Sequence, residues 1–200
     1  MRQETGSNPN SAYKKVSIQV KLGGRSFSAG KVNAADATQL CFVIDTPRVT
    51  LVPREDVTLH TADNLLRIAG KACRMNEQSV CSELQDDIVA IIAIDKEALA
   101  SISERWGSLA SFTSPLLDMS HSEEACLSIS ASEKVCYMRL FGEGMKLQRA
   151  EAFEVSTPED ILYLTSQWIK GNDIPIYIDK SGDCSSVKLL NKYYKRVKCE

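Results

Sequence analysis

One loop combines residue types that could bind a charged ligand. Positions 179–183, Asp179-Lys180-Ser181-Gly182-Asp183, separate an apolar strand from a helix. A glycine before a helix N-terminus can receive an anion, because the first helical N–H groups point toward it. The two carboxylates of the loop would repel a phosphate, and Asp183 or Ser185 would serve as a helix N-cap. We keep Gly182 as a candidate cofactor-binding residue beside the simpler interpretation of a polar loop.

Hydrolytic and metal chemistry find little support in the sequence. Serine or cysteine hydrolysis requires a base beside the nucleophile, and the two histidines, His60 and His121, lie far from any nucleophile-elbow pattern. The seven cysteines are irregularly spaced and include no Cys-x-x-Cys pair, and neither Gly-x-x-x-x-Gly-Lys nor Gly-x-Gly-x-x-Gly occurs. We therefore expect free thiols, no metal and no catalytic residues.

Basic residues crowd the end of the chain. They alternate with apolar and aromatic residues over positions 185–197, which we predict to form a helix, and they are Lys188, Lys192, Lys195, Arg196 and Lys198. Such a helix could bind nucleic acid or another anionic partner. Its apolar stripe could equally pack on a sheet, with the basic side chains suited to the negative end of the helix dipole. We favour the second interpretation and keep the first as an alternative.

The overall composition describes a folded protein without general affinity for anionic polymers. Two hundred residues, 44% of them hydrophobic, suffice to bury a core, and a net charge of −2 does not attract nucleic acid or membranes. No apolar run approaches the ~20 residues of a membrane helix, and the first residues lack the apolar centre of a signal peptide. We expect a cytoplasmic protein with no membrane partner.

The first part of the chain is predicted to begin with strands. Residues 1–13 are polar and are expected to form a disordered tail. Alternating apolar residues at 16–20 predict a strand, and Gly23-Gly24 would turn it into a hairpin with residues 25–29. The elements expected next are a strand pair at 40–44 and 49–52, a helix from Arg54 to about Ala69, an irregular stretch at 71–85, a buried strand at 88–94 and a helix at 96–106.

The second part of the chain is predicted to contain a three-stranded meander followed by a capped helix. The helix spans 158–170, with Thr157 as its N-cap, Pro158 at its first position, and Glu159 and Asp160 opposite the helix dipole. A similar pattern of strand, proline, Glu-Asp and an aliphatic residue occurs at 49–57. The other expected elements are strands at 126–130, 135–141, 145–155 and 174–178 and the helix at 185–197.

These repeated patterns predict a duplicated architecture. Antiparallel strands followed by a helix and a further strand, occurring twice, are typical of ribonuclease H-like half-domains and of actin-like proteins built from two of them. We therefore predict an α+β (α/β-like) fold in which mixed sheets are flanked by helices. The tail at 1–13 would precede a first half at 14–122 and a second half at 123–200.

Scattered residues also carry a family resemblance. They are Val16–Val20 with Gly23-Gly24 and Phe27, then Thr50–Pro53, then Phe153 with Thr157–Tyr163. In this order they resemble the domain of unknown function 3822, a family of mostly Bacteroidetes proteins with an actin-like ATPase fold. The chain departs from the family pattern in two respects, since we expect neither a helix between the first hairpin and Thr50 nor a strand after the last helix. The resemblance therefore implies a shortened form of the fold.

The resemblance also implies where a nucleotide would bind. Actin-like ATPases hold Mg-phosphate with a carboxylate and glycines in the first hairpin of each half. The hairpin at 19–24 retains Gly23 and Gly24 without the carboxylate, and the hairpin at 128–134 lacks both acid and glycine at the corresponding place. We predict a non-catalytic binding or scaffold module without a cofactor and with a protein partner. The alternative is a divergent nucleotide-binding ATPase or kinase-like enzyme that binds ATP and Mg through Gly23, Gly24 and Gly182.

Overall fold

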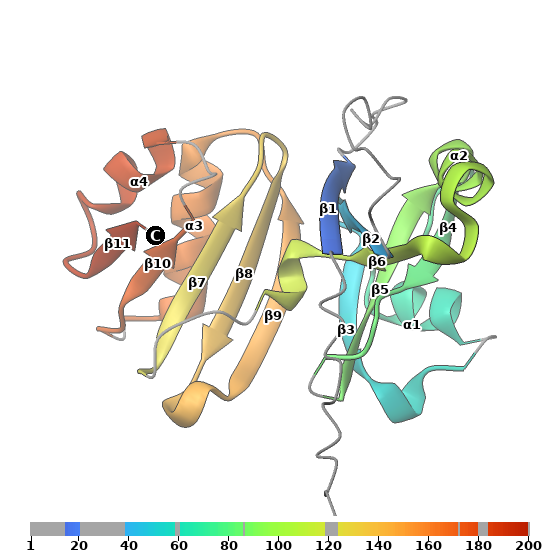
Figure 1. The fold of residues 1–200 in the computed structure, drawn as a ribbon. Coiled ribbons are helices and arrows are strands. Elements are labelled where there is room, and N and C mark those ends of the chain that lie inside the picture. The colour runs from blue at the N-terminus through green and yellow to red at the C-terminus, as the bar shows by residue number, and fades with distance from the viewer. Residues whose placement is uncertain are drawn as a thin grey trace, which may run out of the picture.

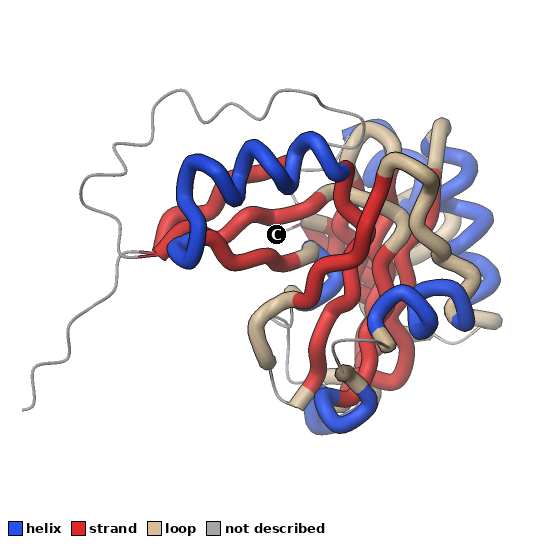
Figure 2. Tube along the Cα trace, turned by 90° about the vertical axis from the view of Figure 1, so that its right-hand side faces the viewer, coloured by secondary structure: helices blue, strands red, loops and turns tan. Residues whose placement is uncertain are grey.

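The computed structural model describes residues 15–20, 39–58, 61–85, 87–118, 124–171, 173–179 and 184–199. The predicted tail, the Gly23-Gly24 turn with residues 25–29, Gly182 and both histidines lie outside these residues. The described residues form a mixed α/β fold with three sheets (Figure 1). Strands occupy the interior and helices surround them (Figure 2). We call the residues up to Asp118 the N-terminal part and those from Glu124 onward the C-terminal part.

The C-terminal part contains one five-stranded sheet with the order β11-β10-β7-β8-β9. Its antiparallel meander, which the sequence predicted, comprises β7 (Cys126–Ala131), β8 (Val135–Phe141) and β9 (Leu147–Glu154). Two further strands run parallel to β7, and each is reached through a helix. They are β10 (Ile176–Ile178) after α3 (Pro158–Ile169), and β11 (Val197–Cys199) after α4 (Cys184–Leu190).

The end of the chain differs from the prediction in two ways. The helix expected at 185–197 ends at Leu190, and the strand expected to be absent is present as β11. After Leu190 the amides of Lys192 and Tyr193 donate to carbonyls three residues back, at 3.1 and 3.0 Å, so the last turn tightens and the helix ends. The amide of Ile176 donates to the carbonyl of Arg196 at 2.8 Å, so the open side of β10 holds the following residues as a strand.

Helix α3 begins with the cap that the sequence predicted. The Thr157 hydroxyl accepts from the amide of Asp160 at 3.3 Å, and the Asp160 carboxylate accepts from the amide of Thr157 at 2.9 Å. The similar pattern upstream behaves differently, and the helix predicted from Arg54 to about Ala69 forms only over its second half. There, β3 ends in the 3₁₀ turn η2 (Arg54–Asp56), which has no side-chain cap, and helix α1 begins only at Ala62. The amide of Thr58 donates to the hydroxyl of Thr61 at 2.8 Å, and this local bond stabilises a turn in place of a helix.

The N-terminal part divides its strands between two small sheets. One is parallel and contains β1 (Lys15–Val20), β2 (Gln39–Ile44) and β6 (Ala110–Thr113). The other is antiparallel with the order β3-β5-β4, formed by β3 (Val49–Pro53), β5 (Ile88–Asp95) and β4 (Glu77–Cys81). Its helices are α1 (Ala62–Ile68) and α2 (Lys96–Trp106), and short 3₁₀ turns occur at Gly107–Leu109 and Pro115–Leu117; a further 3₁₀ turn in the C-terminal part is Glu143–Met145.

This arrangement corrects three predictions. The strand pair expected at 40–44 and 49–52 does not form, because the intervening residues are buried and carry the chain from one sheet into the other. The stretch at 71–85 contains β4, whose residues are mostly half-buried and therefore lack a clear apolar alternation. Strand β6 was not expected either, since four half-buried residues give too short a pattern.

Two apolar clusters form the main cores. The C-terminal core lies on the side of the five-stranded sheet covered by α3 and includes Met138, Ile161 and Trp168. The other core lies on the opposite side of that sheet, and there Tyr137 and Ala152 pack together with residues of the N-terminal part. The five-stranded sheet is thus placed between its own helices and the N-terminal part (Figure 1). Among the described residues, every helix is too short or too polar to span a bilayer.

Candidate functional site

The two parts of the molecule are joined by a buried polar cluster, which we call the junction cluster: Asp45, Thr46, Ser132 and Tyr137. Asp45 follows the carboxyl end of β2, and Ser132 follows the carboxyl end of β7. Oδ1 of Asp45 accepts from the Tyr137 hydroxyl at 2.9 Å and from the Ser132 hydroxyl at 3.1 Å. The amide of Thr46 donates to the Tyr137 hydroxyl oxygen at 2.9 Å. Tyr137 therefore both donates and accepts across the boundary between the two parts.

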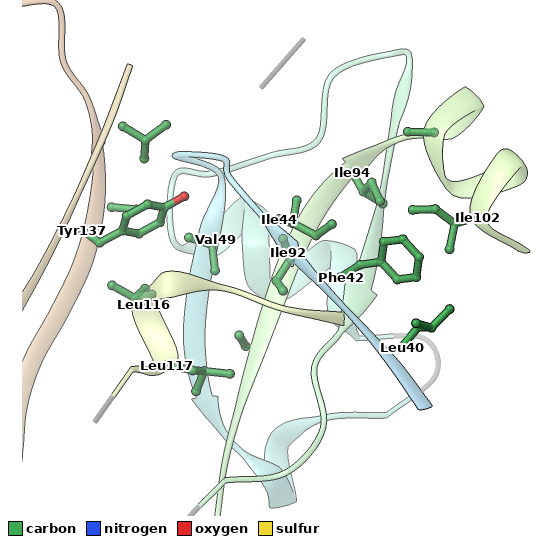
Figure 3. Packing of buried hydrophobic residues seen from close by; sticks show 14 residues of the cluster. Leu40, Phe42, Ile44, Val49, Ile92, Ile94, Ile102, Leu116, Leu117 and Tyr137 are labelled. Atoms are coloured by element: carbon green, nitrogen blue, oxygen red, sulfur yellow. The ribbon is translucent and has the colours of Figure 1, made fainter. Parts of the chain in front are cut away.

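The junction cluster holds the two parts of the molecule together through buried hydrogen bonds. Asp45 is 5% exposed and Tyr137 is 1% exposed, and the ring of Tyr137 reaches from β8 toward Val49 (Figure 3). Burial raises the pKa of Tyr137 well above its ordinary value, and the negative charge of Asp45 raises it further. The phenol therefore stays protonated and acts as a fixed hydrogen-bond donor.

A buried arginine lies on the same face of β8, two residues beyond Tyr137. Arg139 has no exposed surface, and its two terminal nitrogens donate to four oxygens. These acceptors are the carbonyls of Pro115 and Asp118 at 2.6 and 2.9 Å and the hydroxyls of Ser128 and Ser130 at 2.8 and 2.6 Å. Among the residues that the structure describes, the Nε atom has no hydrogen-bond partner. Burial lowers the pKa of Arg139, and the carboxylates of Asp118 and Asp179 act in the opposite direction. A guanidinium nevertheless stays charged in proteins, so Arg139 fixes the segment that connects the two parts.

A second charged contact holds the junction segment from the other side. Arg48 is 9% exposed and forms a bidentate ion pair with Glu77 of β4, in which Nε donates to Oε2 at 2.7 Å. Burial acts to raise the pKa of Glu77, but hydrogen bonds from the Arg48 guanidinium and the Arg74 amide outweigh it, and the net pKa is lowered. The residues from Asp45 to Arg48 are therefore fixed both to the C-terminal part and to the antiparallel sheet.

A groove separates the edges of two sheets. Strand β3 is an edge of the antiparallel sheet and β9 is an edge of the five-stranded sheet, and they lie side by side (Figure 1). The groove has a volume of about 430 Å³ and is mainly apolar. Its lining residues are Leu51, Val52, Pro53, Ile88, Leu147, Gln148, Arg149 and Ala150.

The strand register shows which backbone groups face this groove. The amide of Ala93 donates to the carbonyl of Arg48 at 2.9 Å, and in this antiparallel register the N–H and C=O groups of Leu51 point away from β5. On β9, the carbonyl of Ala152 accepts from Nζ of Lys71 at 2.6 Å, so this carbonyl and every second one along β9 point away from β8. Both walls of the groove are therefore strand edges, which suit an extended polypeptide better than a phosphate.

A second pocket, of about 460 Å³, lies at the end of the antiparallel sheet where β3 and β4 finish and β5 begins. It is lined by Arg54, Val57, Thr58, Cys81, Ser82, Leu84 and Val89. Cys81 is a free thiol there, and burial raises its pKa although the Arg54 charge acts against the shift. Burial also raises the pKa of the Cys136 thiol to about 12. Both thiols are therefore protonated at neutral pH and are poor nucleophiles.

The predicted site residues have different outcomes. Gly23, Gly24 and Gly182 lie outside the described residues, so their role as phosphate ligands stays a prediction. The basic residues do not share one helix. Lys188 belongs to α4, Lys192 and Lys195 follow that helix, and Arg196 and Lys198 lie at β11.

Two of these basic residues are already engaged. Arg196 donates to Glu124 at 2.8 Å, and Lys198 donates to the Tyr177 hydroxyl at 3.0 Å with Glu124 3.6 Å away. The basic residues therefore do not form the single helix face on which the anionic-partner alternative relied, and their binding to an anionic partner stays a prediction. No group of three or more metal-ligating side chains occurs within the part of the chain that the structure describes.

Sequence reasoning missed the residues that join the two parts. Tyr137 and Arg139 were assigned to an ordinary strand, and Asp45 was assigned to a turn. One signal was available, since an arginine in the middle of an otherwise apolar strand predicts a buried charge with several acceptors. The partners of Tyr137 are 91 and 92 positions away and leave no local pattern.

The fold is that of the actin-like ATPases. A protein of Bacteroides thetaiotaomicron, described as having an actin-like ATPase fold and unknown function, is similar over 98% of this chain and 94% of its own, with a TM-score of 0.72 and 16% identity. The expected actin-like fold is thereby confirmed, and the likeness extends over nearly the whole of both chains. A match at this identity establishes the fold alone.

Two other solved structures are more distant. The cytoplasmic domain of EpsL, an inner membrane component of the type II secretion system of Vibrio cholerae, has a TM-score of 0.45 and 10% identity, with 82% of this chain and 81% of that chain covered. The PilM-PilN type IV pilus biogenesis complex has a TM-score of 0.47 and 12% identity, with 84% and 71% covered. No family model and no curated protein matches the sequence, so membership of the domain of unknown function 3822 family stays a prediction.

Proposed function

We propose that this chain is a non-catalytic actin-like protein that serves as a binding or scaffold module for a protein partner in the cytoplasm. The junction cluster carries the proposal. The carboxyl ends of β2 and β7 meet at this cluster. Among the described residues the carboxylate there is that of Asp45, which is buried and accepts hydrogen bonds from Tyr137 and Ser132. Phosphoryl transfer depends on carboxylates that are available to a metal ion, and Asp45 is engaged in holding the protein together.

The groove between β3 and β9 supports a protein as the partner. Its walls present strand edges and mainly apolar side chains, with Arg149 as the charged group. An extended segment of another protein would find backbone donors and acceptors there in addition to apolar contacts.

Nucleotide binding provides the test of this proposal. We expect millimolar ATP with Mg to leave the thermal unfolding temperature unchanged and to remain unhydrolysed, because a ligand stabilises the folded state only if it binds that state. A control with the Tyr137→Phe variant checks whether freeing Asp45 creates a nucleotide site. Clear stabilisation or hydrolysis in the unmodified protein would overturn the proposal.

The alternative function is a divergent nucleotide-binding enzyme, favoured by the glycines retained at Gly23, Gly24 and Gly182. If ATP binds, replacing each glycine by valine should abolish binding, because a β-branched side chain blocks the close approach of phosphate to the backbone. Retention of binding in all three variants would count against this alternative.

We also propose that residues 14–122 and 123–200 are two halves related by duplication. Three parallel strands in chain order support this: β1, β2 and β6 in one half, and β7, β10 and β11 in the other. A helix precedes the third strand in both cases. In this correspondence β3 to β5 would be an insertion into the first half. The sequence pattern at 49–57 would then not be structurally equivalent to the start of α3.

A further inference from the structure

We propose that the hydrogen bonds of Tyr137 to Asp45 and Thr46 form a latch that makes the N-terminal and C-terminal parts unfold as one unit. Much of the remaining contact between the parts is apolar, because Val135 and Ala152 of the C-terminal part share one buried cluster with Leu116, Leu117 and residues of β2, β3 and β5 of the N-terminal part. Apolar contacts tolerate many orientations, whereas hydrogen bonds have narrow geometry. The latch therefore selects one relative orientation of the two parts.

The latch lies at one end of the groove between β3 and β9. Asp45 and Thr46 shortly precede β3, and Tyr137 is paired with Ala152 of β9. The groove itself extends from there along Leu51–Pro53 and Leu147–Ala150. A loss of the latch would therefore act where the two edge strands are held together.

The two parts would respond unequally to this loss. The amide of Thr46 and the carboxylate of Asp45 are buried groups of the N-terminal part, and both would lose a partner. The C-terminal part would lose one hydroxyl and keep its separate core around Trp168. Because an unpaired buried polar group destabilises the segment that carries it, the N-terminal part should unfold first.

The two tryptophans of the chain allow a direct test. Trp106 packs in the core shared with the N-terminal part and Trp168 in the C-terminal core, so Trp168→Phe and Trp106→Phe backgrounds each leave one reporter. Urea unfolding of these backgrounds should give coincident transitions. Adding Tyr137→Phe should lower the midpoint reported by Trp106 by about 0.5 to 1 M urea and leave that of Trp168 nearly unchanged.

Tyr177→Phe is the matched control. Its ring is also buried, and the described partners of its hydroxyl, Glu124 and Lys198, both belong to the C-terminal part. This control should leave the two transitions coincident. If Tyr137→Phe does not fold, Asp45→Ala removes the carboxylate that accepts from Tyr137, leaves the bond from the Thr46 amide, and should separate the transitions in the same direction. Coincident transitions in both latch variants, or an equal separation in Tyr177→Phe, would overturn the proposal.

Discussion

The two parts of the molecule obtain their cores in different ways. The C-terminal core consists entirely of residues from β7 onward, with α3 and α4 covering one face of a five-stranded sheet. The core of the N-terminal part is completed by Val135, Tyr137 and Ala152, which belong to the C-terminal part. The N-terminal strands are divided between two three-stranded sheets, and the antiparallel sheet buries Ile91 and Ala93 against α1 on one face, whereas its other face shares the core that the C-terminal part completes. The comparison indicates that the N-terminal part depends on the C-terminal part for its stability, and not the reverse.

Separating the two parts should have the largest effect. A fragment of residues 124–200 should fold and unfold cooperatively in urea with Trp168 as the reporter, because its core is its own. A fragment of residues 1–118 should fail to give a cooperative transition of Trp106, since part of its core is missing. Circular dichroism and fluorescence measure both. A folded N-terminal fragment, or an unfolded C-terminal one, would contradict the asymmetry.

Replacing Arg139 by alanine should lower the free energy of unfolding by about 4 kcal/mol, because the buried hydroxyls of Ser128 and Ser130 and two backbone carbonyls lose a charged donor and a cavity is left. Arg149 of the neighbouring strand is the matched control. Its side chain is 51% exposed and lies 4.2 Å above the ring centroid of Trp168. Arg149→Ala should cost about 1 kcal/mol or less. Equal effects of the two substitutions would show that the connecting segment is not held by Arg139.

A pair of core substitutions tests the direction of the dependence. Ile102 of α2 and Ile161 of α3 are buried in the two different cores, and each change to alanine should cost about 3 kcal/mol. In the Tyr137→Phe background, where the two transitions are separate, Ile102→Ala should lower the urea midpoint of Trp106 alone. Ile161→Ala should lower the midpoints of both tryptophans, because the N-terminal part depends on its neighbour. If Ile161→Ala lowered the urea midpoint of Trp168 alone, the N-terminal part would not depend on the C-terminal part.

Acid should produce the smallest effect, and it should act on the N-terminal part. The pKa of Glu77 is lowered in the folded protein, so its contribution to stability is fully present above the unfolded value of about 4.3 and is lost as pH falls through the folded pKa. In the Tyr137→Phe background, where the two transitions are separate, Glu77→Gln should reduce this loss of stability in acid as reported by Trp106 and leave the Trp168 transition unchanged. If Glu77→Gln lost stability in acid as the Tyr137→Phe background does, the ion pair of Glu77 with Arg48 would not contribute to the stability of the N-terminal part.

Local signals in the sequence predicted the elements that carry their own caps. Asp95 accepts from two amides at the start of α2, and the capping box of Thr157 begins α3, so both helices could be predicted with accurate starts. Strands β4 and β6 were missed because short, half-buried strands lack a decisive period. The final helix was extended too far because its apolar and basic pattern continues beyond Asn191 into a strand.

The joining residues could not be predicted in the same way. The bonds of Tyr137 depend on bringing together segments about 90 positions apart, and no propensity or spacing encodes that meeting. A buried arginine within β8 gave the one usable hint, since such a charge needs acceptors that the strand itself cannot supply. The buried arginine indicates that another segment packs over that face of the sheet, but it does not identify the segment.

Strand β11 has a consequence for how copies of this protein behave toward one another. Within the described residues its outer side has no strand partner, and an open strand edge can recruit a strand from another molecule. Lys195, Arg196 and Lys198 stand at this edge and are exposed. Two copies approaching edge to edge would bring these positive charges together. The basic residues that suggested an anionic ligand thus discourage aggregation at the end of the sheet, and this protection should weaken as salt screens the charges.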